Sequence, residues 1–445
     1  MSGPALLQAP RPRADLLLRD VHVVDPRAGL DARLDVRIRG GEVTELGAAG
    51  VLAPEPEAEL LEGRGRLLVP AFFDPHVHLR TPGDEDEEDI ASGTHAAAAG
   101  GFVAILAMPN TDPVVDSAAV LSGLVERAGE QAAVPTGFFA AISRGLEGRE
   151  LVDMAELAAR GAAGFSDDGR PVERAGMLRR ALQYSRVTGL KLTLHEEDTT
   201  LTAGSQMHEG AVSAELGLHG YPGIGESVMV GRDLQIARYE HAPLHLCHIS
   251  AAESVAEIRR AKELGVEVTA EVSPHHLCLT DQLVRDLDPA VSKMNPPLRS
   301  AADRAALIEA LADGTLDCIA TDHAPHRTHE KEVPFEAAPN GVIGLETAFA
   351  AVYTELVAPG LVSLPTVIER MSAGPARAFD LPVPALRTGA PADLALWDLS
   401  ESWVVAPPYA SRSRNCAFAG RTLRGRCTVT IAAGTVAHRL AEVAR

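Results

Sequence analysis

At 445 residues, 46% of them apolar and 23% charged, the chain can form a sizeable globular core, and it has no apolar run long enough to span a membrane. Its 61 acidic residues outnumber its 41 basic residues, and the net charge of −20 argues against nucleic acid as a partner, because phosphate binding requires a basic surface. None of the five cysteines stands in a Cys-x-x-Cys pair, so we expect reduced thiols and neither disulfides nor a thiolate zinc site.

Residues 1–13 are rich in proline, alanine and arginine and lack the apolar centre of a secretory signal. We therefore expect a disordered tail there and a cytoplasmic protein. Residues 14–69 and 382–445 contain short apolar runs separated by glycine and proline. Because the ends of a domain often lie close together, we expect strands from both ends to pair in one small β domain.

Strand-like and helical segments alternate over residues 70–381, which we expect to form a second domain. The strand-like runs are rich in apolar and β-branched residues and cover 69–78, 102–108, 136–142, 163–166, 190–195, 244–248, 266–272 and 318–321. The helical segments between them are 85–99, 118–129, 151–160, 176–188, 227–241, 252–264 and 302–312. Repeated βα units predict a parallel sheet, and eight strands favour a closed (β/α)8 TIM barrel over an open doubly wound sheet.

The acidic run at residues 84–89 falls at the start of the first predicted barrel helix. Carboxylates at that position interact favourably with the helix dipole. We expect a solvated helix terminus there and no bound cation.

His76 and His78 follow an apolar run, and residues i and i+2 of a strand share a face, so both imidazoles can point at one metal ion. A His-x-His pair alone is weak support. Four further candidates also follow short apolar runs: Asp168, His195, His248 and Asp322. Singly, each is more often a hydrogen-bonded strand histidine or a turn aspartate. Ligands from so many strands also favour the barrel, since an open sheet concentrates its site at one switch point.

Imidazole and carboxylate ligands suit a catalytic zinc, cobalt or manganese ion better than a structural zinc. Four histidines and two aspartates allow two ions, with Asp168 as the bridge. We assign His76, His78 and Asp322 to the first ion, and His195 and His248 to the second. A hydroxide between the ions would be the nucleophile, because metal binding lowers the pKa of water from 15.7 to about 7. Asp322 is the candidate general acid and base.

The chain resembles the amidohydrolase superfamily and, within it, the class I bacterial dihydroorotases. The motifs that carry the resemblance are 74–83, 108–111, 165–169, 271–276, 293–299 and 320–326. The resemblance implies a distorted (β/α)8 barrel beside a β-sandwich built from both chain ends, with two Zn²⁺ ions per subunit. The implied reaction is the reversible cyclisation of N-carbamoyl-L-aspartate to L-dihydroorotate in de novo pyrimidine (UMP) biosynthesis.

The resemblance also implies roles for individual residues. The six candidates above match the ligands of the zinc pair, with Asp168 where many relatives carry a carboxylated lysine. Residues that match substrate contacts are His78, Arg80, Asn110, Asn295, His326, and Asn340 with Gly341 after a mobile loop at 327–339. Arg80 supplies the forked donor that a carboxylate prefers. Thr81 and Asn340 depart from the family pattern, which usually has glutamate and an aromatic residue there.

Two alternatives stay open. One is another cyclic amidase, such as an allantoinase or a hydantoinase, although Arg80, Asn110 and residues 293–299 favour an acidic ring substrate. The other is a non-catalytic scaffold for an aspartate transcarbamoylase, although such chains lose metal ligands and this one keeps all six. An active enzyme could still bind that transcarbamoylase. We expect a small-molecule substrate and a homo-oligomer that binds neither nucleic acid nor membranes.

Overall fold

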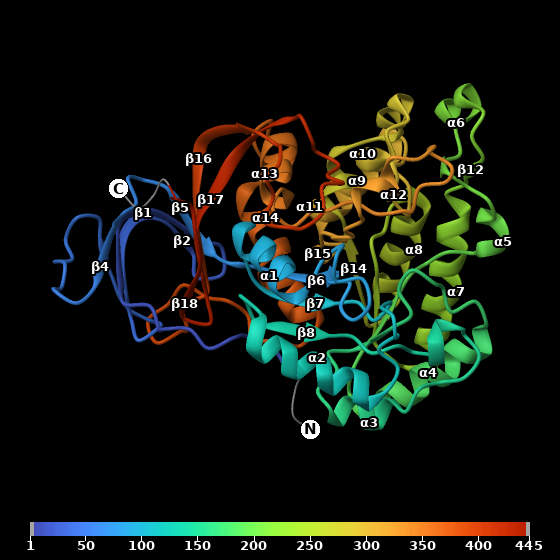
Figure 1. Cartoon of the computed structure of the whole chain (residues 1–445), viewed down its shortest axis with the longest axis horizontal. Helices are drawn as coiled ribbons and strands as arrows, with labels where there is room; N and C mark the ends of the chain where they lie inside the picture. The colour runs from blue at the N-terminus through green and yellow to red at the C-terminus, as the bar shows by residue number, and fades with distance from the viewer. Residues whose placement is uncertain (1–3, 442–445) are drawn as a thin grey trace.

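The computed structural model describes residues 4–441 and has two parts that lie side by side along its long axis (Figure 1). Both chain ends build the smaller part, an eight-stranded sheet in the order β18-β17-β16-β5-β1-β2-β3, with β4 paired to β1. The strands are β1 (Leu16–Asp25), β2 (Leu30–Arg39), β3 (Glu42–Ala48), β4 (Glu59–Glu62), β5 (Leu67–Pro70), β16 (Leu394–Val404), β17 (Thr422–Ala432) and β18 (Thr435–Arg439).

The two ends of the chain join where β5 pairs antiparallel with β16, with Leu68 opposite Leu396. Apolar side chains from β1, β2, β5, β16 and β17 form one shared core in this sheet. The expected sandwich therefore takes the form of one continuous hydrogen-bonded sheet whose strands enclose a common core.

The larger part is a parallel barrel, and each predicted strand-like run contains one of its strands. They are β6 (Phe72–Val77), β7 (Phe102–Ala107), β8 (Thr136–Phe138), β9 (Phe165–Ser166), β10 (Leu192–Leu194), β13 (Leu244–Leu246), β14 (Val268–Val272) and β15 (Cys318–Ile319). Single parallel bridges complete the ring, from Ala140 to Phe165 and from Val77 to His323. The barrel is thus closed, and the open sheet is excluded.

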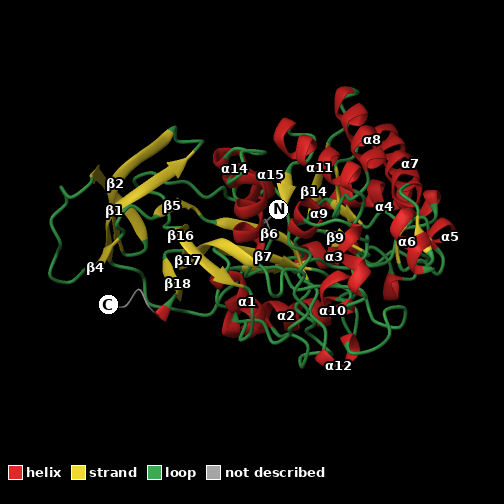
Figure 2. Cartoon of the chain, turned by 90° about the horizontal axis from the view of Figure 1, so that it is seen from above, coloured by secondary structure: helices red, strands yellow, loops and turns green. Residues whose placement is uncertain are grey.

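Helices surround these strands (Figure 2). The barrel helices are α1 (Ile90–Ala99), α2 (Ala118–Gln131), α3 (Met154–Ala159), α4 (Ala175–Thr188), α7 (Ile224–Glu240), α8 (Ala252–Glu263), α11 (Ala301–Asp313) and, after the last strand, α14 (Leu364–Met371) with α15 (Ala373–Ala378). Shorter elements in the connections are α5 (Thr199–Thr202), β11 (Met207–His208), α6 (Ala211–Leu216), β12 (Gly220–Tyr221), α9 (Pro274–Cys278), α10 (Pro289–Ser292), α12 (Thr328–Lys331) and α13 (Ala348–Val352). Among the described residues, no helix is both long and apolar enough to cross a membrane.

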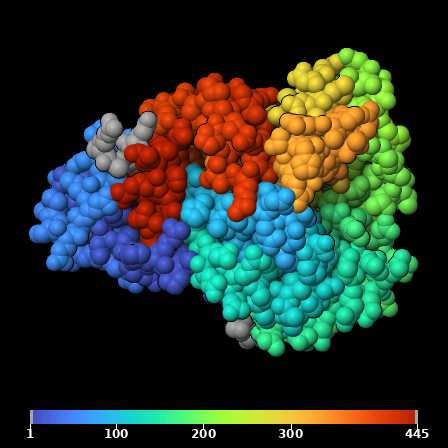
Figure 3. Space-filling model, in the orientation of Figure 1, coloured from blue at the N-terminus to red at the C-terminus, as the bar shows by residue number. Residues whose placement is uncertain are grey.

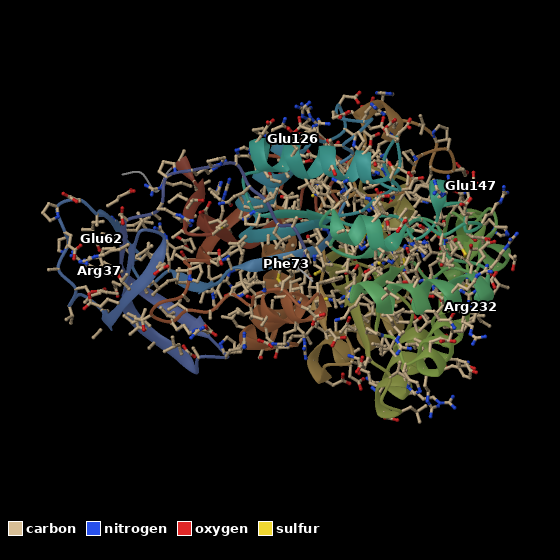
Figure 4. The ribbon with its side chains drawn as sticks, turned by 90° about the horizontal axis from the view of Figure 1, so that it is seen from below. Arg37, Glu62, Phe73, Glu126, Glu147 and Arg232 are labelled. Atoms are coloured by element: carbon tan, nitrogen blue, oxygen red, sulfur yellow. The ribbon has the colours of Figure 1, made fainter. Side chains whose placement is uncertain are left out.

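Aromatic packing joins the sheet to the barrel. The Trp397 ring of β16 lies 5.8 Å from the ring of Phe72 and 4.4 Å from that of Phe349, between centroids. Gly101 has φ +79°, and a Cβ atom there would lie 2.6 Å from the Trp397 ring, so only glycine fits. Figure 4 shows Arg37 and Glu62 at the sheet end of the molecule, Glu147 and Arg232 at the opposite end, and Phe73 between them.

Two expectations about exposed segments differ from the structure. Residues 1–13 were expected as a disordered tail, of which residues 1–3 lie outside the described part of the chain. Residues 4–13 cross the amino end of the barrel, where Leu7 exchanges backbone hydrogen bonds with Thr136 and Leu6 packs on the core. The acidic run was expected to be solvated at the start of the first helix, but α1 begins at Ile90 with Asp89 as its N-cap. Glu87 and Glu88 are buried in ion pairs with neighbouring segments.

Candidate metal centre and active site

The six predicted metal ligands come from five strands of the barrel and meet at its carboxyl end. His76 lies in β6 and His78 is two residues further on, and the others follow β9, β10, β13 and β15 by at most three residues: Asp168, His195, His248 and Asp322. Because the strands are parallel, their carboxyl ends share one mouth. All six side chains are buried there.

Asp168 lies in the middle of the group. Its Oδ1 atom is 3.5 Å from Nε2 of both His76 and His248. The same oxygen is 4.0 Å from Nδ1 of His195, and Oδ2 is 3.5 Å from Nε2 of His78. One carboxylate thus faces both halves of the predicted ligand set, as a bridging ligand must.

The remaining contacts divide the group into two neighbouring sets. Oδ1 of Asp322 lies 3.2 Å from Nε2 of His78 and 3.4 Å from Nε2 of His76. On the other side, Nδ1 of His195 lies 3.1 Å from Nε2 of His248. His76 lies near both sets, because its Nε2 atom is also 3.5 Å from Oδ1 of Asp168.

Three of the histidines have their rings fixed by an oxygen behind them. Nδ1 of His76 lies 2.5 Å from Oε1 of Glu271, and Nδ1 of His78 lies 2.9 Å from Oδ1 of Asn110. Nε2 of His195 lies 2.9 Å from Oε2 of Glu197. A proton on each of these nitrogens makes the other ring nitrogen, which faces the centre, the atom that can ligate a metal ion.

The electrostatics of the site favour a bound cation. Burial alone would raise the pKa of Asp168, but the neighbouring imidazoles of His76 and His248 hold it well below its ordinary value. Burial opposes the charge on His76 too, yet Asp168 and Glu271 raise its pKa well above the ordinary value. The carboxylates therefore stay ionised in a buried site, where only positive charge can balance them.

The donor set fits a metal ion. Nε2 of His76 and Oδ1 of Asp168 are buried at the centre, and neither has a hydrogen-bond partner among residues 4–441. The ligand atoms of His76, His78 and Asp322 lie within 4.8 Å of one another, and so do those of His76, Asp168, Cys247 and His248. Nitrogen and oxygen donors that leave room for water suit zinc, cobalt or manganese in a catalytic site. The structure thus has a centre that can hold metal.

A pocket of about 190 Å³ opens over this centre. It is lined by every predicted site residue except His76, which lies beneath it with no exposed surface. The predicted substrate contacts around the pocket are His78, Arg80, Asn110, Asn295, His326, Asn340 and Gly341. Residues from widely separated parts of the chain thus converge as the sequence predicts.

Arg80 brings a guanidinium to this pocket, and other residues hold its Nε atom from behind. Its Nε atom donates to the carbonyl oxygen of Pro325 at 3.0 Å and lies 3.1 Å from Oε2 of Glu87. The backbone of Arg80 has φ +54°, which is uncommon for a residue with a side chain. The Nε side is thus restrained, and Nη2 lies 3.5 Å from Nε2 of His326, another residue of the pocket, so the terminal nitrogens are donors for an anion there.

The segment 327–339 borders the pocket and contains α12. Lys293 donates from Nζ to the carbonyl oxygen of Glu336 at 3.1 Å, and Lys331 donates to that of Pro339 at 2.7 Å. Arg327, at the start of the segment, pairs with Asp84 at 2.7 Å. In Figure 3 the orange surface of this region lies against the light-blue surface that follows the first barrel strand. The segment therefore packs down beside the pocket.

The residues after this segment complete the pocket wall. Nε2 of His326 donates to the carbonyl oxygen of Asn340 at 2.7 Å, and the N–H of Gly341 donates to the carbonyl of Lys293 at 3.0 Å. Gly341 has φ +135°, and a Cβ atom there would lie 2.7 Å from Cβ of Ala324. Only glycine allows this close approach.

Three carboxylates at the site were not predicted from the sequence. Glu197 accepts hydrogen bonds from Nε2 of His195 and from Nδ2 of Asn295, both at 2.9 Å, and so links a ligand to a predicted substrate contact. Glu271 stands behind His76, and Glu87 stands behind Arg80. Glu197 lies two residues after the candidate ligand His195, and Glu271 is the first residue of the motif 271–276. Neither position in the sequence reveals which side chain the glutamate contacts.

Solved structures of known fold define the class of this protein. It superposes on an L-hydantoinase (dihydropyrimidinase) from Arthrobacter aurescens with a TM-score of 0.84 and 24% identity, over 96% of both chains. The dihydropyrimidinase from Brevibacillus agri NCHU1002 gives a TM-score of 0.81 and 23% identity, over 96% of this chain and 95% of that one. The fold is that of the amidohydrolase TIM barrels.

Sequence relatives define the family. The chain is 48% identical to a dihydroorotase from Anaeromyxobacter sp. (strain K) over 425 residues, which cover 95% of this chain and 98% of the relative. It is 47% identical over 422 residues to a dihydroorotase from Pelotomaculum thermopropionicum, with the same coverage. A family model described as dihydro-orotase-like matches residues 65–254. The chain belongs to the dihydroorotase family and is a cyclic amide hydrolase.

Proposed function

We propose that this protein interconverts N-carbamoyl-L-aspartate and L-dihydroorotate in pyrimidine synthesis. The observation that carries the proposal is the identity of 43–48% to dihydroorotases over at least 95% of the chain. The pocket supports it, because Arg80 stands beside six candidate metal ligands and can bind the carboxylate that both compounds carry.

The proposal includes two Zn²⁺ ions per subunit, held by His76, His78 and Asp322 and by His195 and His248, with Asp168 between them. Bound metal ions of this kind polarise a carbonyl group and lower the pKa of water to about 7. The four histidines and two aspartates are buried, and their donor atoms lie close enough together for this role.

The other residues act on the substrate and its protons. Arg80 binds the carboxylate, and Asn110, Asn295 and His326 orient the ring and the carbamoyl group. Asp322 lines the pocket and takes a proton at its carboxylate, which it delivers to the nitrogen that leaves when the ring opens. In the opposite direction the same carboxylate removes that proton before the ring closes.

The proposal also covers the setting of the enzyme. We propose a cytoplasmic homo-oligomer in which residues 14–69 and 382–445 form one domain and 70–381 the other. Association with an aspartate transcarbamoylase fits an enzyme of the same pathway. Light scattering of the purified protein, alone and mixed with that transcarbamoylase, tests both interactions.

A hydantoinase or allantoinase activity is the closest alternative, but its support is likeness of fold at 22–24% identity. The test compares turnover of dihydroorotate, hydantoin and allantoin by one preparation whose metal content has been measured. We expect turnover of dihydroorotate alone and about two zinc ions per chain. Turnover of hydantoin or allantoin without dihydroorotate would contradict the proposal, and a stable chain with neither metal nor activity would favour the scaffold.

A further inference from the structure

We propose that Glu271 is a positioning residue that fixes ligands in both halves of the metal centre at once. Glu271 lies in β14, between the strands β13 and β15, and is 1% exposed. Its Oε1 atom is 2.5 Å from Nδ1 of His76 and 3.2 Å from the backbone nitrogen of His248. The inference rests on the proposed metal centre and adds a role that lies outside its ligand set.

The first contact decides how His76 faces the centre. A carboxylate accepts a hydrogen bond, so Nδ1 carries a proton, and Nε2 is the nitrogen that would ligate a metal ion. Nε2 points toward Asp322, at 3.4 Å, and toward Asp168, at 3.5 Å. His76 has no exposed surface, so water does not compete for Nδ1. Glu271 therefore fixes both the tautomer and the direction of this ring.

The second contact restrains the backbone of His248. This residue has φ +29°, an unfavourable conformation for a residue with a side chain, so it needs support from its surroundings. The side chain of Glu271 accepts a hydrogen bond from the N–H of His248. The backbone carbonyl of Glu271 accepts a hydrogen bond from the N–H of Ile249 at 2.9 Å. Both bonds hold the turn that aims Nε2 of His248 at Asp168, 3.5 Å away.

The other oxygen of Glu271 is fixed by a second histidine. Nε2 of His245 lies 3.0 Å from Oε2 of Glu271, and Nδ1 of His245 lies 2.8 Å from the hydroxyl of Thr269. The hydroxyl can donate to Nδ1, which leaves the proton on Nε2 for Glu271. Two imidazoles and one backbone N–H thus surround the carboxylate.

Glu197 provides a comparison within the same site. Glu197 also accepts a hydrogen bond from a predicted ligand, because its Oε2 atom lies 2.9 Å from Nε2 of His195. Among the six predicted ligands, His195 is the one that Glu197 contacts, and the Glu197 side chain is 14% exposed at the edge of the pocket. Glu271 differs because it joins β6 to β13, and these strands carry ligands of the two ions. We therefore expect its loss to weaken both metal ions.

The test measures the zinc affinity of the full-length protein by competition with a chromogenic chelator. We expect Glu271→Gln to lower the affinity by about 10- to 100-fold at both ions. The d–d absorption bands of the Co²⁺-loaded variant should shift, because the ligand geometry changes. The far-ultraviolet circular dichroism should match that of the unmodified protein. Asp35→Asn is the matched control, since Asp35 is a buried carboxylate with three N–H donors in the separate sheet.

Thr269→Val decides the question if Glu271→Gln does not fold. It removes the hydroxyl that orients His245 and should weaken zinc binding in the same direction, by a smaller factor. Zinc affinity within about twofold of the unmodified protein in the folded variants would overturn the inference, as would an equal loss in Asp35→Asn. A different outcome, failure of the unmodified protein to bind zinc or turn over dihydroorotate, would count against the proposed function itself.

Discussion

Oδ1 of Asp322 lies 3.2 Å from Nε2 of His78, which follows the neighbouring barrel strand, so that one carboxylate belongs both to the ligand set and to the pocket wall. The backbone of Asp322 has φ +49°, a conformation that turns the chain sharply after β15. This position puts a carboxylate in the wall of the pocket, where the proposed function requires a proton acceptor.

We expect Asp322→Asn to reduce kcat by about 10²- to 10⁴-fold in both directions of the reaction, the usual contribution of a general acid and base. The amide keeps an oxygen that can contact metal but cannot accept and return a proton at neutral pH. Five candidate ligands remain, so most of the metal should stay bound. Steady-state kinetics and elemental analysis of the same preparation measure both effects.

The control is Asp380→Asn, because Asp380 is an exposed carboxylate at the far end of the barrel. It should leave kcat and metal content unchanged. A near-normal kcat in Asp322→Asn with metal bound would show that another group transfers the proton. Loss of all metal would instead assign Asp322 a purely ligating role.

Arg80→Met should mainly raise KM, by about 10- to 100-fold. A hydrogen bond to a charged group contributes about 1.5–3 kcal/mol, and methionine keeps an unbranched apolar side chain without the donors. Glu87 would then lose a partner 3.1 Å away but keep its ion pair with Arg327 at 3.0 Å, so the remaining carboxylate stays compensated. Initial rates over a range of dihydroorotate concentrations separate KM from kcat.

The matched control for this change is Arg174→Met, an exposed arginine just before α4. If the rise in KM came only from the lost positive charge and its general attraction for the anionic substrate, Arg80→Met and Arg174→Met would raise KM alike. An unchanged KM in Arg80→Met would remove Arg80 from the substrate site.

The sequence predicts the barrel because its signal is local and repeated. Apolar runs of four to ten residues alternate with helical segments, and each run contains a barrel strand. The helices after the last strand, α14 and α15, were missed because a long connection separates them from β15. The position of residues 4–13 could not be predicted either, since Leu6 and Leu7 are held by contacts with residues over 100 positions away.

Side chains that face the centre were predicted from the sequence, whereas the side chains that hold them were not. His76 and His78 are recognisable by their spacing and Asp168 by its motif, because ligand chemistry restricts the residue types. Glu87 looked like part of a solvated acidic run, yet it is 5% exposed and pairs with Arg80. A glutamate that accepts a hydrogen bond can come from any neighbouring segment, so no spacing in the sequence reveals it.

The segment 327–339 should loosen when Lys293 is replaced by methionine. Nζ of Lys293 donates to Oε1 of Gln206 at 2.8 Å and to backbone carbonyls of Phe335 and Glu336, and methionine removes these donors while it keeps the apolar stem. Loss of about 1–3 kcal/mol of local stability corresponds to amide exchange about 5- to 150-fold faster. Hydrogen–deuterium exchange of residues 332–339, followed by mass spectrometry, measures this change.

Lys191→Met serves as the control, because Lys191 also donates to a backbone carbonyl, that of Ala378, away from the pocket. Exchange in residues 332–339 should not change in this variant. Equal exchange rates in Lys293→Met and the unmodified protein would mean that other contacts, such as those of Arg327 and Lys331, hold the segment without Lys293.

Asp35→Asn should destabilise the sheet at neutral pH but not in acid. The carboxylate of Asp35 is buried and accepts the N–H groups of Asp20, Gly50 and Leu52 at 2.8, 3.0 and 2.9 Å. Burial alone would raise its pKa, but these backbone donors lower the pKa below 3.8. A lowered pKa means that the ionised form stabilises the fold above the unfolded-state pKa, and that this stability is lost as pH falls through the folded-state pKa.

The free energy of unfolding of the sheet should therefore drop by about 1–3 kcal/mol in Asp35→Asn at pH 7, and the difference from the unmodified protein should shrink below about pH 4. Both tryptophans of the chain, Trp397 and Trp403, lie in β16, so urea titrations followed by tryptophan fluorescence report on this sheet. Asp31→Asn changes an exposed aspartate of β2 and should have little effect at any pH. A difference that stays constant from pH 7 to pH 3.5 would mean that the shape of the side chain, and not its charge, holds the three N–H groups.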